Sequence, residues 1–324
     1  MSVAEDDAVP VCVCGERAVT PRRVWARDEL GGARFCYVQC AACGAERLSP
    51  RPSPGEIGAY YPDNYSPHMI RGETFATRLK RLVYLTYYAT TNRLGGWRAP
   101  LRLLLAPLRG HTVFAFHAVE PKRVFEFGGA TGNDLVRFRD EGWEVDGCEP
   151  SASACAIAAG RGIVLRHQPA EAVDLPAGSV SCVLLNNVLE HLHDPGAVLA
   201  MSARALVAGG SLVVIVPNHA SISARLFGAA WPGYDAPRHL WGFTPGALAA
   251  RMVAAGFAQP VVHHLFQGRW AWRSTMDGRH AAEPVAAWRV RWAGPLSALL
   301  LPFGMLFALL RRGDFIMVVA TRAG

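Results

Sequence analysis

Glu126-Phe127-Gly128-Gly129-Ala130-Thr131-Gly132 joins the end of a short apolar run to a turn of small residues. Glycine lacks a Cβ, so such a turn lets the backbone approach a ligand at the N-terminus of the next helix. The turn reads G-x-A-x-G and lacks the G-x-G-x-x-G spacing of a dinucleotide site. A glycine-rich turn alone is weak support, and its meaning depends on the sequence around it.

Short apolar runs and helical stretches alternate from residue 122 onward. We predict buried strands over residues 123–129, 144–149, 163–168, 180–187 and 211–217, and helices over 133–141, 151–159, 195–206 and 245–255. Ser151, Asp194 and Thr244 are natural helix caps. Two last apolar runs, 261–266 and 315–320, add an antiparallel pair. The pattern predicts an α/β fold with a doubly wound, Rossmann-like, seven-stranded sheet that binds ligands at the carboxyl ends of its strands.

The second predicted strand ends at an acidic residue, Glu149. A carboxylate at this place can accept hydrogen bonds from both hydroxyls of a ribose. Glu149 therefore strengthens the interpretation of the glycine turn as a nucleoside site.

Four segments now carry a family resemblance. Residues 126–132 resemble motif I of class I S-adenosylmethionine (SAM)-dependent methyltransferases, and residues 145–150 resemble their second motif. Residues 188–195, VLEHLHDP, resemble the segment after the fourth strand in the methyltransferase type 11, 12 and 23 families, and residues 174–176 fit the loop before that strand. The resemblance implies a SAM-binding methyltransferase domain.

The resemblance also assigns positions to the cofactor. It implies that Glu149 binds the ribose, that Glu171 lies near the adenine, and that Asn186 and Asn187 border the site of methyl transfer, Asn187 toward the acceptor. The family often has an acid where this chain has Pro169, which puts the adenine contact in doubt. The residues implied to face the methionine part of SAM are Glu126, Gly128, Gly129, Ala130 and Gly132.

Residues 231–243 form a long aromatic loop after the fifth predicted strand. The loop is similar in plan to that of bacterial sugar C-methyltransferases, which place a glutamate-histidine pair where this chain has Arg238-His239. Histidine suits proton removal from an acceptor. We expect His239 to act as the base, Arg238 to anchor an acidic group of the acceptor, and Tyr234 to contact it. The alternative is that His239 caps the next helix and Arg238 pairs with Asp235, and both interpretations are open.

Two further groups are catalytic or substrate-binding candidates. His191 follows Glu190 in the family segment, and its alternative role is to stabilise a helix start or line the pocket. Tyr60 and Tyr61 are expected to contact the substrate and Tyr65 to take part in catalysis, because a phenol offers an apolar face and a hydrogen bond. The tyrosine cluster could equally join two domains.

Two cysteine pairs, each followed by glycine, lie near the N-terminus: Cys12 with Cys14, and Cys40 with Cys43. Four thiolates bind zinc tetrahedrally, and the metal replaces a core that a short segment cannot build alone. We expect a zinc-ribbon-like module over residues 1–70 with a structural Zn²⁺. Cys36 is a possible substitute ligand, and a module that has lost its metal is the alternative.

The chain has 324 residues, a net charge of +7, 51% hydrophobic and 18% charged residues, which excludes wholesale disorder. No signal peptide is recognisable, so we expect a cytoplasmic protein. Residues 71–120 form a basic, apolar connector, and residues 121–324 the methyltransferase domain, with a helical insertion near 280–312. The apolar run 296–310, closed by Arg311 and Arg312, makes peripheral contact with the inner face of a membrane possible.

The expected activity is methylation of a small metabolite, a sugar or a lipid-linked glycan precursor, on oxygen or carbon. A non-catalytic SAM-fold or zinc-ribbon binding protein is one alternative. An RNA methyltransferase is another, although residues 186–189, NNVL, lack the N/D-P-P-Y/F signature of many base-amino methyltransferases. Basic charge in an arginine-rich chain is weak support for a nucleic-acid partner.

Overall fold

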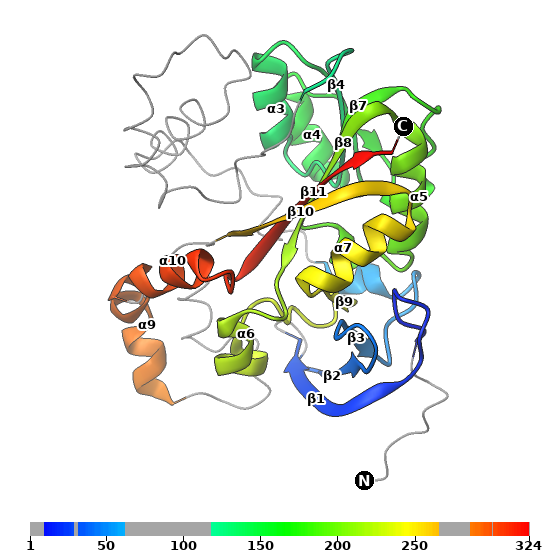
Figure 1. Cartoon of the computed structure of the whole chain (residues 1–324). Helices are drawn as coiled ribbons and strands as arrows, with labels where there is room; N and C mark the ends of the chain where they lie inside the picture. The colour runs from blue at the N-terminus through cyan, green and yellow to red at the C-terminus, as the bar shows by residue number, and fades with distance from the viewer. Residues whose placement is uncertain (1–9, 29–31, 62–117, 266–285, 300, 324) are drawn as a thin grey trace.

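The computed structural model describes residues 10–28, 32–61, 118–265, 286–299 and 301–323. Tyr65 lies outside these residues, and so does the predicted connector over 71–120 apart from its last three residues, 118–120. The described chain contains two sheets, with the N-terminal strands at one end of the molecule and a larger sheet at the other (Figure 1).

The larger sheet has seven strands, as the sequence predicts, in the order β10-β11-β8-β7-β4-β5-β6. The strands β4 to β8 run parallel, and β11 pairs antiparallel with both β8 and β10. Their bounds are β4 Arg123–Phe127, β5 Glu144–Glu149, β6 Arg166–His167, β7 Val180–Asn186, β8 Leu206–Pro217, β10 Phe257–Leu265 and β11 Phe315–Arg322. This is the doubly wound α/β fold that the sequence predicts, with an antiparallel pair of strands at one edge.

Alternate residues of the central strands face two hydrophobic cores. On β7, Val183 and Leu185 belong to one core, whereas Cys182 and Leu184 belong to the other. The first core also contains residues of α5 (Pro195–Ala205) and α7 (Pro245–Ala254), and the second contains residues of α3 (Asn133–Asp140) and α4 (Ala152–Ala159). Helices therefore cover both faces of the sheet, as parallel strands require.

The three expected helix caps are confirmed. The side chain of Ser151 accepts a hydrogen bond from Ala154 N, that of Asp194 from Ala197 N, and that of Thr244 from Ala247 N. Each bond satisfies one of the backbone N–H groups that a helix start leaves without an intrahelical partner.

The third predicted strand is shorter than expected. Only Arg166 and His167 pair with β5, at the edge of the sheet. Ile163 and Leu165 are buried in the core with α3 and α4, so their apolar character reflects packing under helices and not strand pairing. A short edge strand also exposes few unpaired backbone groups.

The N-terminal sheet has the order β1-β2-β3-β9, with β1 Val19–Arg27, β2 Arg34–Cys40, β3 Glu46–Ser49 and β9 Trp241–Gly242. Its last strand comes from the loop after β8, where Arg47 pairs with Trp241 and Glu46 with Gly242. A module ending near residue 70 remains a prediction, but its sheet is completed by a strand some two hundred residues later in the chain.

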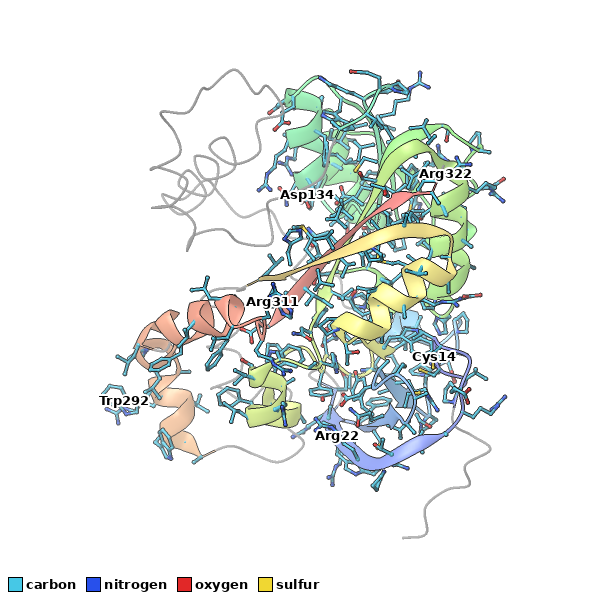
Figure 2. All side chains as sticks on the ribbon, viewed as in Figure 1. Cys14, Arg22, Asp134, Trp292, Arg311 and Arg322 are labelled. Carbon is cyan, nitrogen blue, oxygen red and sulfur yellow. The ribbon has the colours of Figure 1, made fainter. Side chains whose placement is uncertain are left out.

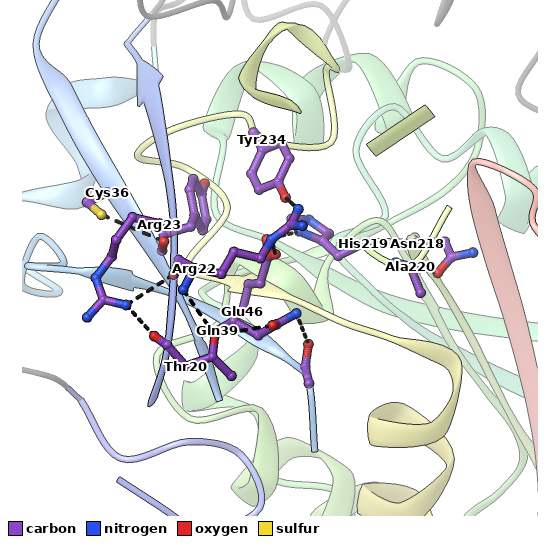
Figure 3. Close-up of polar contacts among 12 residues, drawn as sticks. Thr20, Arg22, Arg23, Cys36, Gln39, Glu46, Asn218, His219, Ala220 and Tyr234 are labelled. Atoms are coloured by element: carbon purple, nitrogen blue, oxygen red, sulfur yellow. Dashed lines mark hydrogen bonds and ion pairs between the residues drawn. The ribbon is translucent and has the colours of Figure 1, made fainter. Parts of the chain in front are cut away.

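A buried polar network joins the N-terminal sheet to the end of β8 (Figure 3). His219 contacts Glu46 Oε2 through Nδ1 at 2.9 Å and donates from Nε2 to Gly233 O at 3.1 Å. Arg22 donates to the other Glu46 oxygen at 3.1 Å. Burial raises the pKa of Glu46, but the bond to His219 and the charge of Arg22 outweigh it and hold that pKa below its usual value. The two sheets are thus connected by a carboxylate with partners on both sides.

Candidate functional site

The turn after β4 has the geometry that its glycines predict. Gly128 and Gly132 have φ of 62° and 72°, in the left-handed region that favours glycine. A Cβ on Gly128 would lie 2.5 Å from Val188 Cγ2, so a side chain there would displace the side chain of Val188. Ala130 also has a positive φ, 44°, although it carries a side chain. A strained residue at this place is typical of a binding loop.

Glu149 lies at the carboxyl end of β5 and holds this turn. Its Oε2 accepts a hydrogen bond from Ala130 N at 2.9 Å, and its Oε1 accepts one from Ser151 N at 2.9 Å. The side chain is buried, and its two bonds connect the turn after β4 to the start of α4. A carboxylate has about four lone-pair sites, so these bonds leave acceptor capacity for hydroxyls.

Glu126 is the buried carboxyl under the turn. Its Oε2 has no hydrogen-bond partner among the described residues and lies 3.6 Å from the Cβ position that Gly129 leaves empty. Burial, with a further contribution from Asp134, raises the pKa of Glu126 well above its usual value. Such an oxygen suits a buried cation, and the ammonium group of SAM is one. The residues present therefore fit SAM, with Glu126 and the turn toward its methionine part and Glu149 toward its ribose.

Asp134 is a site residue that the sequence analysis missed. It stands in the first turn of α3, directly after the glycine turn, where an acid is favoured by the helix dipole. Its Oδ2 accepts a hydrogen bond from Asn186 Nδ2 at 2.8 Å, and its Oδ1 pairs with Arg137 at 3.2 Å. The sequence could have indicated Asp134 by its position directly after the glycine turn. Asp134 therefore links the turn to the end of β7.

The end of β7 brings two predicted residues together. Asn187 donates from Nδ2 to Asn186 Oδ1 at 2.9 Å and has a positive φ of 55°. Glu171 is exposed, and its carboxylate accepts a hydrogen bond from His193 N at 3.0 Å. The assignments of Asn186 and Asn187 to methyl transfer and of Glu171 to adenine stay predictions.

A cluster of one carboxyl and two imidazoles follows β7. Glu190 and His191 lie on η7 (Leu189–His191), and His239 lies in the loop before β9. The rings of His191 and His239 are 4.6 Å apart between centroids, and His239 Nε2 is 4.0 Å from Glu190 Oε1. Tyr61 OH is 3.0 Å from His191 Nδ1. The structure thus brings His191, His239 and Tyr61, three predicted site residues, to one place.

Burial neutralises all three members of this cluster. It lowers the pKa of His191 to about 4 and that of His239 to about 3, and it raises the pKa of Glu190 to about 8. At neutral pH both histidines are therefore uncharged and Glu190 is mostly protonated. A general base works best when its pKa lies near the operating pH, so this environment disfavours His239 in that role. The assignment of His239 and His191 to proton transfer stays a prediction.

Two expected acceptor contacts have other partners. Arg238 forms a two-point ion pair with Asp235 and donates to Tyr60 O at 3.1 Å, which is the alternative pairing that the sequence left open. Tyr234 is fully buried against Tyr37 and His219 at the junction of the two sheets, and its assignment to the acceptor stays a prediction. Its aromatic loop packs inward because the N-terminal sheet covers it.

The four cysteines of the predicted metal site come together. Cys12 Sγ is 3.6 Å from Cys43 Sγ, Cys14 Sγ is 3.6 Å from Cys40 Sγ, and all four sulfurs lie within 4.8 Å of one another. Tetrahedral zinc with Zn–S bonds of about 2.3 Å sets sulfur–sulfur distances of about 3.8 Å, so the cluster fits a structural zinc. The glycines after each pair, Gly15 and Gly44, have φ of 91° and 71°, as the tight turns require. Cys36 is buried on β2 outside the cluster.

Among the described residues, no helix is both long enough and apolar enough to cross a membrane. The helical insertion contains α9 (Ala287–Leu299) and α10 (Leu301–Leu309), which come before the last strand as expected.

Comparison with known proteins gives the family. A family model described as a methyltransferase domain matches residues 100–264, just over half of the chain. A search of curated proteins found no match.

Several solved structures are similar to this chain at low sequence identity. One is a SAM-dependent methyltransferase, possibly a histamine N-methyltransferase, of Thermotoga maritima (19% identity, 76% of this chain and 96% of that chain, TM-score 0.44). Another is phospholethanolamine N-methyltransferase 2 of Haemonchus contortus (15%, 79% and 62%, 0.47). A third is geranyl diphosphate C-methyltransferase of Streptomyces coelicolor A3(2) (14%, 64% and 72%, 0.43).

The family match covers β4 to β8, and with them the glycine turn, Glu149 and the segment after β7. The chain therefore belongs to the methyltransferase-domain family and is a SAM-dependent methyltransferase.

Proposed function

We propose that this methyltransferase acts on a hydroxylated small-molecule acceptor, a sugar or a lipid-linked glycan precursor, and methylates an oxygen or an acidic carbon. The observation that carries the proposal is the polar group at the end of β7, where the Tyr61 hydroxyl lies 3.0 Å from His191 Nδ1 and Asn187 follows the strand. Hydroxyl, imidazole and amide groups recognise hydroxylated ligands by hydrogen bonds.

When bound, SAM supplies an electrophilic methyl group on a sulfonium. The residues of this chain would position the acceptor in line with that methyl and shield it from water, because positioning supplies much of the rate of such a transfer. Tyr61 and Asn187 are the groups proposed to orient the acceptor, and His191 holds the Tyr61 hydroxyl in place. The N-terminal sheet supports this place, since Tyr37 donates to the carbonyl of His239 at 2.7 Å.

The test is transfer of a deuterated methyl group from labelled SAM to an acceptor panel of nucleotide sugars, lipid-linked glycans and bulk RNA. Mass spectrometry is expected to show the label in one of the two glycan classes and none in RNA. Glu144→Ala, at an exposed acid of β5, serves as the active control variant. Label in RNA, with none in the glycans, would overturn the proposed acceptor class.

A second observation favours a membrane-bound acceptor. Eight large apolar residues of α9, α10 and the position directly after α10 are at least 46% exposed: Trp288, Val290, Trp292, Leu299, Phe303, Leu306, Leu309 and Leu310. Arg291, Arg311 and Arg312 are exposed beside them, and Trp292 lies on the outer side of α9 (Figure 2). Exposed apolar side chains flanked by arginines suit the surface of an anionic bilayer. We propose that this helix pair holds the enzyme at such a surface.

Binding to phosphatidylglycerol vesicles tests this helix pair. The double variant Trp292→Glu with Leu309→Glu is expected to weaken vesicle binding at least roughly tenfold, because each large apolar side chain contributes about 1.5–3 kcal/mol when buried. Trp25→Glu, at an exposed tryptophan on β1, is the matched control. Equal cosedimentation of the two variants would contradict the proposal. So would unmodified protein that binds neutral phosphatidylcholine vesicles as strongly as phosphatidylglycerol vesicles.

A further inference from the structure

Glu190, His191 and His239 place three metal-ligating side chains around one point. One donor atom of each lies within 4.8 Å of the others, although His239 comes from a different segment than the other two. Glu190 is 1% exposed and His239 is 7% exposed. The cluster is separate from the four cysteines, which form their own group near the N-terminus.

Both imidazoles are oriented as metal ligands usually are. His239 Nδ1 donates to Gly233 O at 2.8 Å, and His191 Nδ1 donates to Arg238 O at 3.0 Å. A carbonyl only accepts, so each ring carries its hydrogen on Nδ1 and keeps a lone pair on Nε2. The Tyr61 oxygen, also 3.0 Å from His191 Nδ1, then accepts from the same N–H. Histidines that bind metals almost always donate their other ring N–H to a carbonyl or a carboxylate, which fixes the ring and its tautomer.

Glu190 supplies the second, independent observation. Neither oxygen of its buried carboxyl has a hydrogen-bond partner among the described residues, and Oε1 points toward His239 Nε2 at 4.0 Å. A buried carboxyl without partners is unfavourable unless something binds it. A cation between Glu190 and the two imidazoles would supply the partner that this carboxyl lacks.

The backbone around the cluster is held from several sides. Leu240 N donates to Glu190 O at 2.8 Å, and Trp241 Nε1 donates to Leu192 O at 2.8 Å. Tyr37, from the N-terminal sheet, donates to His239 O at 2.7 Å. These bonds fix the loop before β9 on the segment after β7, so His239 stays close to Glu190 without a ligand between them.

We propose that Glu190, His191 and His239 bind one first-row divalent transition-metal cation, with at least one coordination position open to the acceptor. Two imidazoles and one carboxylate suit such an ion. Ligand distances of about 2.0–2.2 Å place the donor atoms roughly 3–3.5 Å apart, so binding would draw the side chains slightly together.

The open position gives the site a role in the proposed methyl transfer, on which this inference rests. An acceptor hydroxyl bound there would lose its proton to solvent more readily, because a metal lowers the pKa of a bound oxygen. The oxygen would then form a bond to the methyl carbon while the carbon–sulfur bond breaks, leaving S-adenosylhomocysteine. The balance needs no oxidant or reductant.

Cobalt titration of the full-length protein tests the site. Co²⁺ in the four-cysteine cluster gives an intense thiolate-to-metal charge-transfer band, whereas Co²⁺ on nitrogen and oxygen ligands gives only weak visible bands. The unmodified protein is expected to bind one equivalent of Co²⁺ that gives the weak visible bands of nitrogen and oxygen ligands. Glu190→Gln and His239→Ala are each expected to weaken this binding at least roughly 100-fold, which exceeds the effect of a lost outer contact. His264→Ala, on β10, is the matched control and should bind as the unmodified protein does.

Two further measurements keep the outcomes distinct. Mn²⁺ binding followed by electron paramagnetic resonance uses the unmodified protein, and thiolates are poor ligands for this ion, so uptake reports the nitrogen and oxygen site. Calorimetry with SAM on the same samples reports the proposed function separately. Absence of both the weak cobalt bands and Mn²⁺ uptake in protein that binds SAM would overturn the metal site alone. Metal uptake in protein without SAM affinity or methyl transfer would instead reject the proposed function.

Discussion

Alanine in place of Glu149 is expected to weaken SAM binding at least roughly 100-fold. Glu149 accepts hydrogen bonds from Ala130 N and Ser151 N, so its removal leaves two backbone donors of the cofactor loop without their acceptor. It also removes the expected acceptor for the ribose hydroxyls. Hydrogen bonds to a charged group contribute about 1.5–3 kcal/mol each, and a tenfold change in affinity corresponds to about 1.4 kcal/mol.

Calorimetric titration with SAM measures this loss, after circular dichroism has shown that the variant is folded. Glu149→Gln is expected to bind weakly as well. Both carboxylate oxygens accept from backbone N–H groups, and the amide nitrogen of glutamine cannot accept. Glu144→Ala removes an exposed acid from the same strand and should bind SAM within about twofold of the unmodified protein, since exposed ion pairs contribute little. Unchanged affinity in folded Glu149→Ala would falsify the cofactor assignment.

The sheet was predictable because its signals are local. Apolar runs bounded by glycine and proline mark the parallel strands, and Ser151, Asp194 and Thr244 cap the helices where the sequence places them. The same signals misjudged the length of the third strand. Ile163 and Leu165 are as apolar as a buried strand, but they pack beneath helices, and an apolar run alone does not distinguish the two environments.

The site was predictable only where its signals are local in the sequence. The cysteine pairs and Glu149 depend on spacing near a turn or at a strand end, which a sequence displays directly. The pairing of Arg47 with Trp241 depends on two distant segments meeting, and it turns Tyr234 into a core residue at the junction. The same loop brings His239 to Glu190, so the cluster of three ligands could be seen only in the fold.

Loss of one zinc ligand is the second large effect, and Cys40→Ser is the variant that tests it. Cys40 ends β2, is 1% exposed, and has its sulfur 3.6 Å from that of Cys14. A structural zinc contributes folding free energy directly, so the variant is expected to lose the bound metal. Losing a metal belongs to the substitutions that cost about 4 kcal/mol or more. The expected fall in Tm is roughly 10 °C.

Cys36→Ser separates the metal from simple burial of a cysteine. Cys36 is also buried on β2 but stands outside the cluster, so its variant should keep one equivalent of zinc and lose much less thermal stability. Equal zinc content and equal Tm for the two variants would show that the cluster holds no structural metal.

The expected effects on function also differ. The residues assigned to SAM lie on the seven-stranded sheet, so Cys40→Ser should still bind SAM. Its methyl transfer should fall, because β9 pairs with β3 and Tyr37 holds the His239 carbonyl, and both contacts depend on a folded N-terminal sheet.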